Sequence, residues 1–440
     1  MQLRKIARAR LAGPLLTAAA LIALYAVGAS RPLLGPEEYR NGLATPPDLG
    51  WAAPCWEAAR RLGDVRWASA AAALAGVLAV WGFVRLHRRE PAEPAALLTA
   101  VTGLWFFGGT VASPLIFFAL PLVLAVFGVS AALTGRGWRR WAAGAVALAG
   151  IAGVAGGWPI LTRLPDFRRP EMMPLLLIGF LPLLMLVTPA YAGWRKLDVK
   201  SPLLRTALAG LALSLGAAWL GPAGFVAAAP FAAIIWVLSL EAVFDDPEGM
   251  TRFDRVVRHW LVIVLAAALV LFLLQLGTQL KWLGPEWRLY RQPGKYVMAL
   301  LVAGIAVGWW RHAIRESRAR GKQFFFIVGF AILLMAVPAT LLPDRTLERL
   351  APAEALRPFD LSDGTVIADA DLIPALRYRG VAAERLRPIG DMLELAETVR
   401  NDEGPLTVVT RRILPAGFPA PARRFRLMNT GIHLWEYDRR

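Results

Sequence analysis

The chain has 440 residues, of which 57% are hydrophobic and only 18% are charged. This composition is far too apolar for an ordinary soluble protein and indicates many membrane spans. The formal net charge of +17 would suit nucleic acid, but the basic residues gather in short loops between apolar segments, as membrane topology requires. We therefore predict a membrane protein with no nucleic-acid partner.

Cysteine and histidine usage excludes two classes of site. Cys55 is the only cysteine, so neither an intrachain disulfide nor a cysteine metal cluster can form. The four histidines are scattered and have no HxxH or HExxH spacing. The sequence thus predicts no zinc site built from protein ligands.

Apolar segments recur along the first three quarters of the chain, and a bilayer core needs roughly 20 apolar residues per helix. We predict eleven spans, at 11–29, 68–84, 95–111, 114–134, 141–157, 172–191, 203–220, 222–240, 260–280, 296–310 and 324–342. A break near Gly108, Gly109 and Pro114 makes residues 95–134 a predicted helical hairpin, and a break at Gly221-Pro222 makes residues 203–240 another. The predicted fold class is an α-helical polytopic membrane protein with about eleven transmembrane helices.

Loop charge sets the expected topology. The N-terminus and every loop on its side are basic, from "MQLRKIARAR" to "RHAIRESRARGKQ". The positive-inside rule therefore places the N-terminus in the cytoplasm. Residues 1–29 also resemble a cleavable secretory signal with "VGA" before Ser30, but the apolar run is long for a signal, so we favour a retained anchor.

The last hundred residues differ in kind. Residues 343–440 are charged and carry strand-like runs "GTVIADA", "LTVVTRR" and "GIHLWEYD", with helical spacing between them. We predict a small extracytoplasmic α/β domain in β-α-α-β order, with Pro374 near the first turn of a helix. Its acids have no EF-hand spacing, so we interpret them as strand-end residues rather than a calcium site. They are Asp360, Asp363, Asp369 and Asp371.

The second unit, residues 1–342, is the predicted transmembrane domain. Its spans contain almost no ionisable residue, which argues against an ion-coupled transporter. Any site must then be built from loops at the membrane surface or from polar backbone at broken helices. On the predicted outer face, charged loops lie at 30–67, 158–171 and 281–295.

These outer loops contain basic side chains, which the positive-inside rule disfavours on this face, together with aromatic side chains. Guanidinium forks match phosphate oxygens, and aromatic rings suit the headgroup level. We predict a lipid phosphate or diphosphate as the ligand; pairing with bilayer phospholipid or flanking acids is the alternative. The candidate substrate-binding residues are Arg31, Arg40, Arg163, Arg168, Arg169, Lys281, Arg288, Tyr290, Arg291 and Lys295.

Glu37 and Glu38 follow the first span directly, in "RPLLGPEEYR". A carboxylate held beside guanidinium groups can act as a general base toward an acceptor while the cations hold an anionic lipid leaving group. We predict both glutamates as catalytic residues; a solvated pair of loop acids is the alternative. Two glutamates make a thin ligand set for a divalent cation, so no metal and no cofactor is predicted.

The stretch "RPLLGPEEYR" resembles the Pro-Asp-Glu-x-Arg-Tyr signature of bacterial polytopic C-type glycosyltransferases, which include lipid A aminoarabinose transferases and protein O-mannosyltransferase-like enzymes. Pro36, Glu37, Glu38 and Arg40 match it in order. Further stretches such as "ASPLIFFALPLVLAV" are similar to later spans. The resemblance implies a polyprenyl-phosphate sugar donor, a lipid, glycan or protein acceptor, membrane-lipid contacts, and a multi-pass location in the bacterial cytoplasmic (inner) membrane. It gives Glu37 the role of the catalytic carboxylate.

Three departures from the family pattern keep other functions open. Ala112 stands where the family has a second acid, "GGWP" replaces its Lys-Gly-Pro, and "LGPAG" replaces its Ser-Lys-Leu-Pro. We predict a glycosyltransferase. The alternatives are a catalytically inactive relative that binds a lipid-linked glycan or a partner, and a lipid or polysaccharide transporter or ligase.

Overall fold

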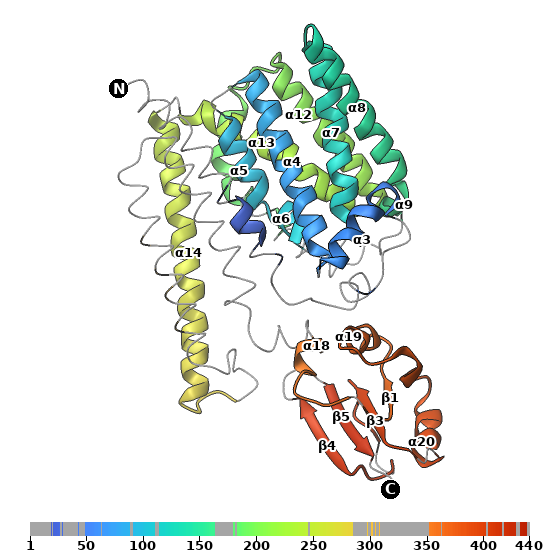
Figure 1. Cartoon of the computed structure of the whole chain (residues 1–440). Helices are drawn as coiled ribbons and strands as arrows, with labels where there is room; N and C mark the ends of the chain where they lie inside the picture. The colour runs from blue at the N-terminus through green and yellow to red at the C-terminus, as the bar shows by residue number, and fades with distance from the viewer. Residues whose placement is uncertain are drawn as a thin grey trace, which may run out of the picture.

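The computed structural model describes two units, a bundle of helices and a C-terminal sheet with its helices (Figure 1). The described residues are 49–62, 64–88, 91–110, 114–162, 183–244, 247–284, 352–361, 363–401, 404–415, 418–427 and 432–437, with isolated residues at 19, 21–26, 29, 43, 179–180, 297, 301, 304 and 308.

The first unit is built from long apolar helices. It comprises η1 (Gly50–Ala52), α3 (Ala53–Arg61), α4 (Arg66–His87), α5 (Ala92–Val101), α6 (Gly103–Thr110), α7 (Leu115–Thr134), α8 (Trp138–Gly156), α9 (Trp158–Thr162), η3 (Leu184–Leu186), α11 (Val187–Trp194), α12 (Pro202–Leu220), α13 (Ala223–Phe244) and α14 (Pro247–Gln279). Within the described residues, four helices are long and apolar enough to cross a membrane: α4, α7, α12 and residues 223–243 of α13.

The spans predicted at 68–84, 114–134, 141–157, 203–220 and 222–240 coincide with helices α4, α7, α8, α12 and α13. The break at Gly221-Pro222 is confirmed, because it separates α12 from α13, and α7 starts after Pro114 as expected. Gly108 and Gly109 do not break the helix, since both lie within α6. The span at 324–342 lies outside the described residues, as do most residues of those at 11–29 and 296–310. Of the span at 172–191, residues 179–180 and 183–191 are described, the latter including η3 and the first part of α11. The total of eleven therefore stays a prediction.

Two predicted segments need correction. The span at 95–111 is two helices, α5 and α6, because Thr102 adopts an extended conformation between them. The loop expected before the span at 260–280 is helical, since α14 begins at Pro247.

Small residues allow the helices to approach closely. A Cβ atom on Gly150 of α8 would lie 2.4 Å from the Ala125 nitrogen of α7, and one on Gly128 would lie 2.5 Å from the Ala147 nitrogen. α7 and α8 share the most extensive contact in the bundle. Without a hydrophobic driving force inside a bilayer, such close backbone packing is what holds helices together.

The helices alternate in direction, which gives the bundle two distinct ends (Figure 1). The turns after α4, α7 and α11 lie at one end. α3, the start of α7, the α8–α9 corner and the α12–α13 turn lie at the other, which we call the α3 end.

The second unit is a five-stranded mixed sheet. Its elements are α18 (Pro352–Ala355), β1 (Thr365–Ala368), α19 (Ile373–Tyr378), η6 (Ala383–Arg385), β2 (Leu386–Pro388), α20 (Met392–Asn401), β3 (Leu406–Thr410), β4 (Arg423–Leu427) and β5 (Ile432–Tyr437). The order is β2-β1-β3-β5-β4, with β1 parallel to β2 and β3, and β5 antiparallel to β3 and β4.

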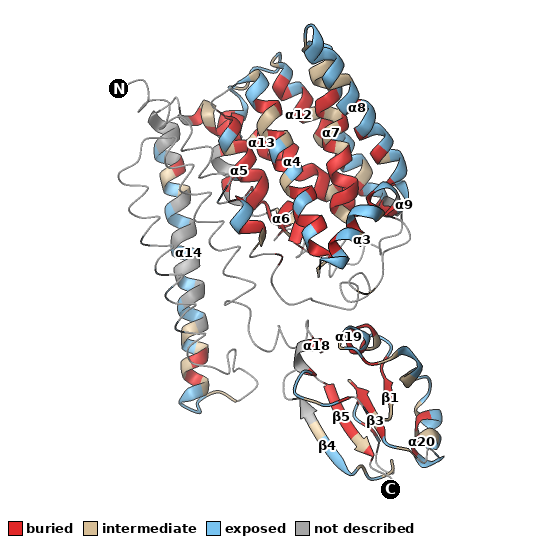
Figure 2. Cartoon of the chain, in the orientation of Figure 1, coloured by how far each residue is buried: buried red, intermediate tan, exposed pale blue. Residues whose placement is uncertain are grey.

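The strand alternation divides the core of this unit into two layers. Val366 and Leu434 point to the face covered by α18 and α19, whereas Ile367, Val408 and Trp435 point to the face covered by α20. Figure 2 shows the buried residues concentrated in β1, β3 and β5. The three strand-like runs form β1, β3 and β5, and Pro374 lies in the first turn of α19 as expected. The expected β-α-α-β order is wrong, because strand β2 lies between α19 and α20 and pairs with β1. Placement of this unit outside the cytoplasm stays a prediction.

Candidate functional site at the α3 end of the bundle

Helix α3 lies in the first predicted outer loop, and the turn η1 leads into it. Trp56 is fully buried, and its ring meets Phe117 of α7 edge-on with 5.8 Å between centroids. Trp51, from η1, makes a similar contact with Phe117 at 6.0 Å and lies beside Gly153 and Gly156 of α8. The segment after the glutamate motif is thus packed onto the ends of two bundle helices.

An ion pair within α3 and a hydrogen bond from its arginine connect this helix to the chain that precedes it. Glu57 accepts two hydrogen bonds from Arg60, at 3.0 Å from Nε and 2.7 Å from Nη2. The Glu57 carboxylate raises the pKa of Arg60 through these bonds. Arg60 Nη1 in turn donates to the Leu43 carbonyl at 3.1 Å. Arg60 therefore fixes the main chain at Leu43. Leu43 lies three residues after Arg40, which is the last residue of the matched motif.

Arg66 forms a buried ion pair at the start of α4. Its side chain is 6% exposed and that of Asp64 is 25% exposed. Arg66 Nε lies 3.0 Å and 2.9 Å from the two Asp64 carboxylate oxygens, and Nη2 also donates to Asp64. A buried guanidinium needs such a fork-to-fork partner, because losing water around either charge costs several kcal/mol. The pair fixes the corner between α3 and α4.

Lys281 terminates α14 in an uncommon conformation. Its backbone φ is +59°, in the left-handed region that favours glycine. The Trp282 nitrogen donates to the Gly277 carbonyl at 2.9 Å, and the Lys281 nitrogen is 3.4 Å from the Thr278 carbonyl. This is the bonding pattern of a Schellman cap with lysine at the usual glycine position. The turn directs the chain out of the helix and leaves Lys281 and Trp282 exposed.

Lys281 is the one predicted site residue among those that the structure describes. Glu37, Glu38, Arg31 and Arg40 lie outside the described residues. So do Arg163, Arg168, Arg169, Arg288, Tyr290, Arg291 and Lys295. Whether Glu37 approaches these cations therefore stays a prediction, although other residues of the first two loops, such as Leu43 and Thr162, are described.

Among the described residues, no group of three or more His, Cys, Asp or Glu could hold a metal ion. The strand-end interpretation of two C-terminal acids is confirmed. Asp369 accepts from the Thr410 hydroxyl at 3.1 Å and the Arg411 main-chain nitrogen at 2.6 Å. Asp371 pairs with the Arg411 guanidinium at 2.9 Å. These carboxylates therefore connect the segment after β1 to the end of β3.

Sequence reasoning missed three features at this end: helix α3, the burial of Arg66 and the cap at Lys281. Pro54 in the first turn and the spacing of Trp56 and Ala59 could have signalled the helix. Nothing in the sequence distinguishes Arg66 from the exposed arginines around it, because its burial depends on how α4 packs.

No protein-family model matches the chain, and no curated protein matches it. Two crystal structures do match. One is ArnT from Cupriavidus metallidurans bound to undecaprenyl phosphate, with a TM-score of 0.61, 14% identity, and 97% of this chain and 98% of ArnT covered. The other is the same protein in the apo state, with a TM-score of 0.60 and the same identity and coverage. Along nearly its whole length, the chain therefore has the fold of ArnT.

Proposed function

We propose that this protein is a membrane glycosyltransferase that moves a sugar from a polyprenyl-phosphate donor to a lipid, glycan or protein acceptor. The observation that carries the proposal is the likeness to ArnT over 97% of the chain, including a structure with undecaprenyl phosphate bound. The glutamate motif, which resembles that of the same superfamily, supports it independently.

The chemistry follows from the charges in the outer loops. Glu37, with Glu38 beside it, removes a proton from the acceptor as the acceptor attacks the sugar. The leaving group is the polyprenyl phosphate, whose negative charge grows as the bond to the sugar breaks. Cations such as Arg163, Arg288 and Lys281 stabilise that charge more in the transition state than in the ground state, which lowers the barrier.

We also propose that the α3 end faces the outside of the cytoplasmic membrane. The opposite end carries the basic residues expected on the cytoplasmic side: Arg85, Arg88, Arg136, Arg139, Arg140, Arg195, Lys196 and Lys200. Exposed aromatic side chains lie near both ends, as in a membrane protein with two interfaces. They include Trp138, Trp141 and Trp194 at the basic end, and Trp67, Trp158 and Trp219 at the α3 end.

The described helices favour this function over ion-coupled transport. Among the side chains of α4 to α14 that the structure describes, Arg66 is the one charged residue that is buried, and it lies at the first position of α4. The other buried polar side chains there are serines, threonines and Gln275. Proton and ion relays need ionisable groups at bilayer depth, and the described parts of these helices lack them.

A catalytically inactive relative is the second candidate, and one described segment favours it. The α8–α9 corner reads Gly156-Gly157-Trp158-Pro159 and lacks the lysine that the superfamily has there. Such a protein would bind the lipid-linked sugar without transferring it. Native mass spectrometry of the purified protein with undecaprenyl phosphate measures binding alone, and together with the transfer assay below it separates these two candidates.

The test of the proposed function is sugar transfer in membrane fractions supplied with radiolabelled polyprenyl-phosphate sugars. We expect Glu37→Gln to abolish most transfer, since an amide cannot accept the proton; general-base removal costs about 100-fold or more. Glu93→Gln is the matched control, because Glu93 is exposed at the start of α5, at the opposite end. Transfer that survives Glu37→Gln removes this residue from the mechanism, and binding without any transfer supports the inactive relative.

A further inference from the structure

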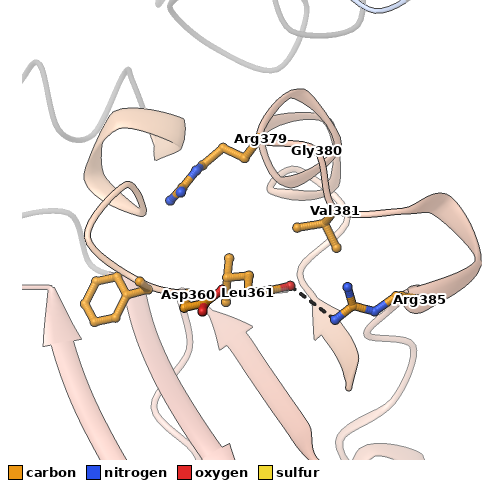
Figure 3. Close-up of a pocket in the computed structure, with 7 residues that line it drawn as sticks. Asp360, Leu361, Arg379, Gly380, Val381 and Arg385 are labelled. Atoms are coloured by element: carbon orange, nitrogen blue, oxygen red, sulfur yellow. Dashed lines mark hydrogen bonds between the residues drawn. The ribbon is translucent and has the colours of Figure 1, made fainter. Parts of the chain in front are cut away.

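The C-terminal unit contains a cavity that the proposed transfer reaction does not use. It has a volume of about 180 Å³. It lies between the segment that precedes β1 and the turn that follows α19, and its lining residues are Phe359, Asp360, Leu361, Arg379, Gly380, Val381 and Arg385. Figure 3 shows Arg379 and Arg385 extending toward it from two sides, with Asp360 and Leu361 between them.

Both arginines are fixed by main-chain carbonyl groups. Arg385 donates from Nε to Gly364 at 2.7 Å and from Nη2 to Leu361 at 3.1 Å. Arg379 donates to the carbonyls of Leu356 and Arg357. The two bonds of Arg385 use two of the five N–H donors of a guanidinium. The cost of ordering these long side chains is therefore met before any ligand arrives, which favours binding.

The turn after α19 keeps one side of the cavity open. Gly380 has a φ of +88°, and no atom lies within 4 Å of the position that a Cβ would occupy. Glycine is therefore required by the backbone conformation rather than by crowding. The turn places the buried side chain of Val381 against the cavity. Arg379, just before the turn, and Arg385, just after it, line the same cavity.

The lining selects the class of ligand. Two guanidinium groups and one carboxylate leave a net positive charge, which suits a phosphate or carboxylate group. The Asp360 carboxylate is an acceptor for hydroxyl hydrogens, and Phe359, Leu361 and Val381 offer apolar surface to the C–H face of a ring. At about 180 Å³ the cavity is smaller than the pockets of roughly 300–1,000 Å³ that hold drug-sized ligands, so one ring with one charged group is the appropriate size.

We propose that this cavity binds a single sugar residue that carries a phosphate or a carboxylate. The binding proposal stands without the transferase function. If both hold, the C-terminal unit provides a docking site for an acidic glycan separate from the glutamate motif.

Isothermal titration of the purified full-length protein in detergent tests the proposal. The probes are glucose 6-phosphate, glucuronate, glucose and inorganic phosphate. We expect both acidic sugars to bind, and glucose to bind at least about 10-fold more weakly, because it lacks the charge that the guanidinium groups contact. Inorganic phosphate that binds as tightly as the acidic sugars would indicate a simple anion site and overturn the sugar assignment.

Two variants and one control locate the site. Arg385→Gln should weaken binding of both acidic sugars by about 10-fold or more. Arg387→Gln removes an exposed arginine two residues away that does not line the cavity, and it should bind as the wild type does. Val381→Phe narrows the cavity but keeps the carbonyl bonds of both arginines, so it should abolish binding. It tests the proposal even if Arg385→Gln fails to fold. Undiminished binding in Val381→Phe, or no binding of either acidic sugar to the wild type, overturns the proposal.

Discussion

Lys281 combines two roles that can be separated by mutation. Its left-handed backbone costs about 1 kcal/mol relative to glycine, while its side chain is free to meet an anionic headgroup. We expect Lys281→Gly to raise the free energy of unfolding by about 0.5–1 kcal/mol and to reduce affinity for undecaprenyl phosphate. Thermal unfolding and native mass spectrometry measure the two effects.

Lys281→Ala is the matched control for this prediction. Alanine removes the amine but keeps the backbone strain, so affinity should fall without a gain in stability. A Lys281→Gly protein that is less stable than the wild type would contradict the interpretation of the cap.

Tyr437 is expected to make stability depend on pH in the alkaline range. Burial raises its pKa to about 12, whereas a tyrosine in the unfolded chain ionises near pH 10. Between pH 10 and 12 the folded state holds more protons than the unfolded state, so the free energy of unfolding falls with rising pH. Two pKa steps at 1.36 kcal/mol each correspond to about 2–3 kcal/mol, present below pH 10 and lost by pH 12.

Tyr437→Phe should remove this dependence. The Tyr437 hydroxyl is buried and has no hydrogen-bond partner among the described residues, so replacing it with hydrogen should not destabilise the sheet. The difference between the tyrosinate absorbance titrations of wild type and variant isolates this one group. A midpoint near 10 instead of about 12 would show that the hydroxyl reaches water.

At the scale of the element, the packing of α8 on α7 makes a direct prediction. Gly150 faces the α7 backbone at a distance that admits no Cβ, whereas nothing lies within 4 Å of the Cβ position at Gly144 of the same helix. Gly150→Leu should force the helices apart and lower stability by several kcal/mol, in the manner of an overpacked core. Gly144→Leu should be neutral or slightly stabilising, since glycine is a poor helix former.

Thermal unfolding of the two variants in detergent measures the difference. Equal melting temperatures would show that the α7–α8 contact is not tight.

The helix boundaries show how much the sequence could predict. Proline and glycine mark the start of α7 and the α12–α13 turn, so those breaks were predictable. Thr102 carries no such mark, because it lies in an apolar run and threonines with the same hydroxyl bond, such as Thr99 and Thr110, lie inside helices; only its extended backbone ends α5. β4 was missed because "RRFRL" has only two apolar residues, and an edge strand is defined by its pairing with β5.

The candidate site was predictable to a smaller extent. Charges in the outer loops identify Lys281 as an exposed residue, but its cap depends on hydrogen bonds to Gly277 and Thr278. The Asp64–Arg66 pair depends on a corner whose geometry local sequence does not encode. Charge type is therefore readable from sequence, whereas burial and partners require the fold.

At the scale of the whole molecule, the single cysteine offers a test of orientation. Cys55 is exposed in α3, at the end that we propose faces outward. A membrane-impermeant maleimide should label it in intact cells from which any outer membrane has been permeabilised. In a Cys55→Ser background, Lys200→Cys places a thiol at the opposite end and should react only after the inner membrane is opened. The reverse pattern would invert the proposed topology.

The glycine- and alanine-rich face of α8 has a consequence for biogenesis. α8 is not among the four helices apolar enough to cross a membrane by the measure of length and composition, and its first turn carries Arg139 and Arg140. Its main contact is with α7, which is one of the four, and only Gly135 to Gly137 separate the two helices. The less apolar helix α8 therefore depends on the more apolar α7 for its insertion into the bilayer. We expect α7 and α8 to insert together as a hairpin.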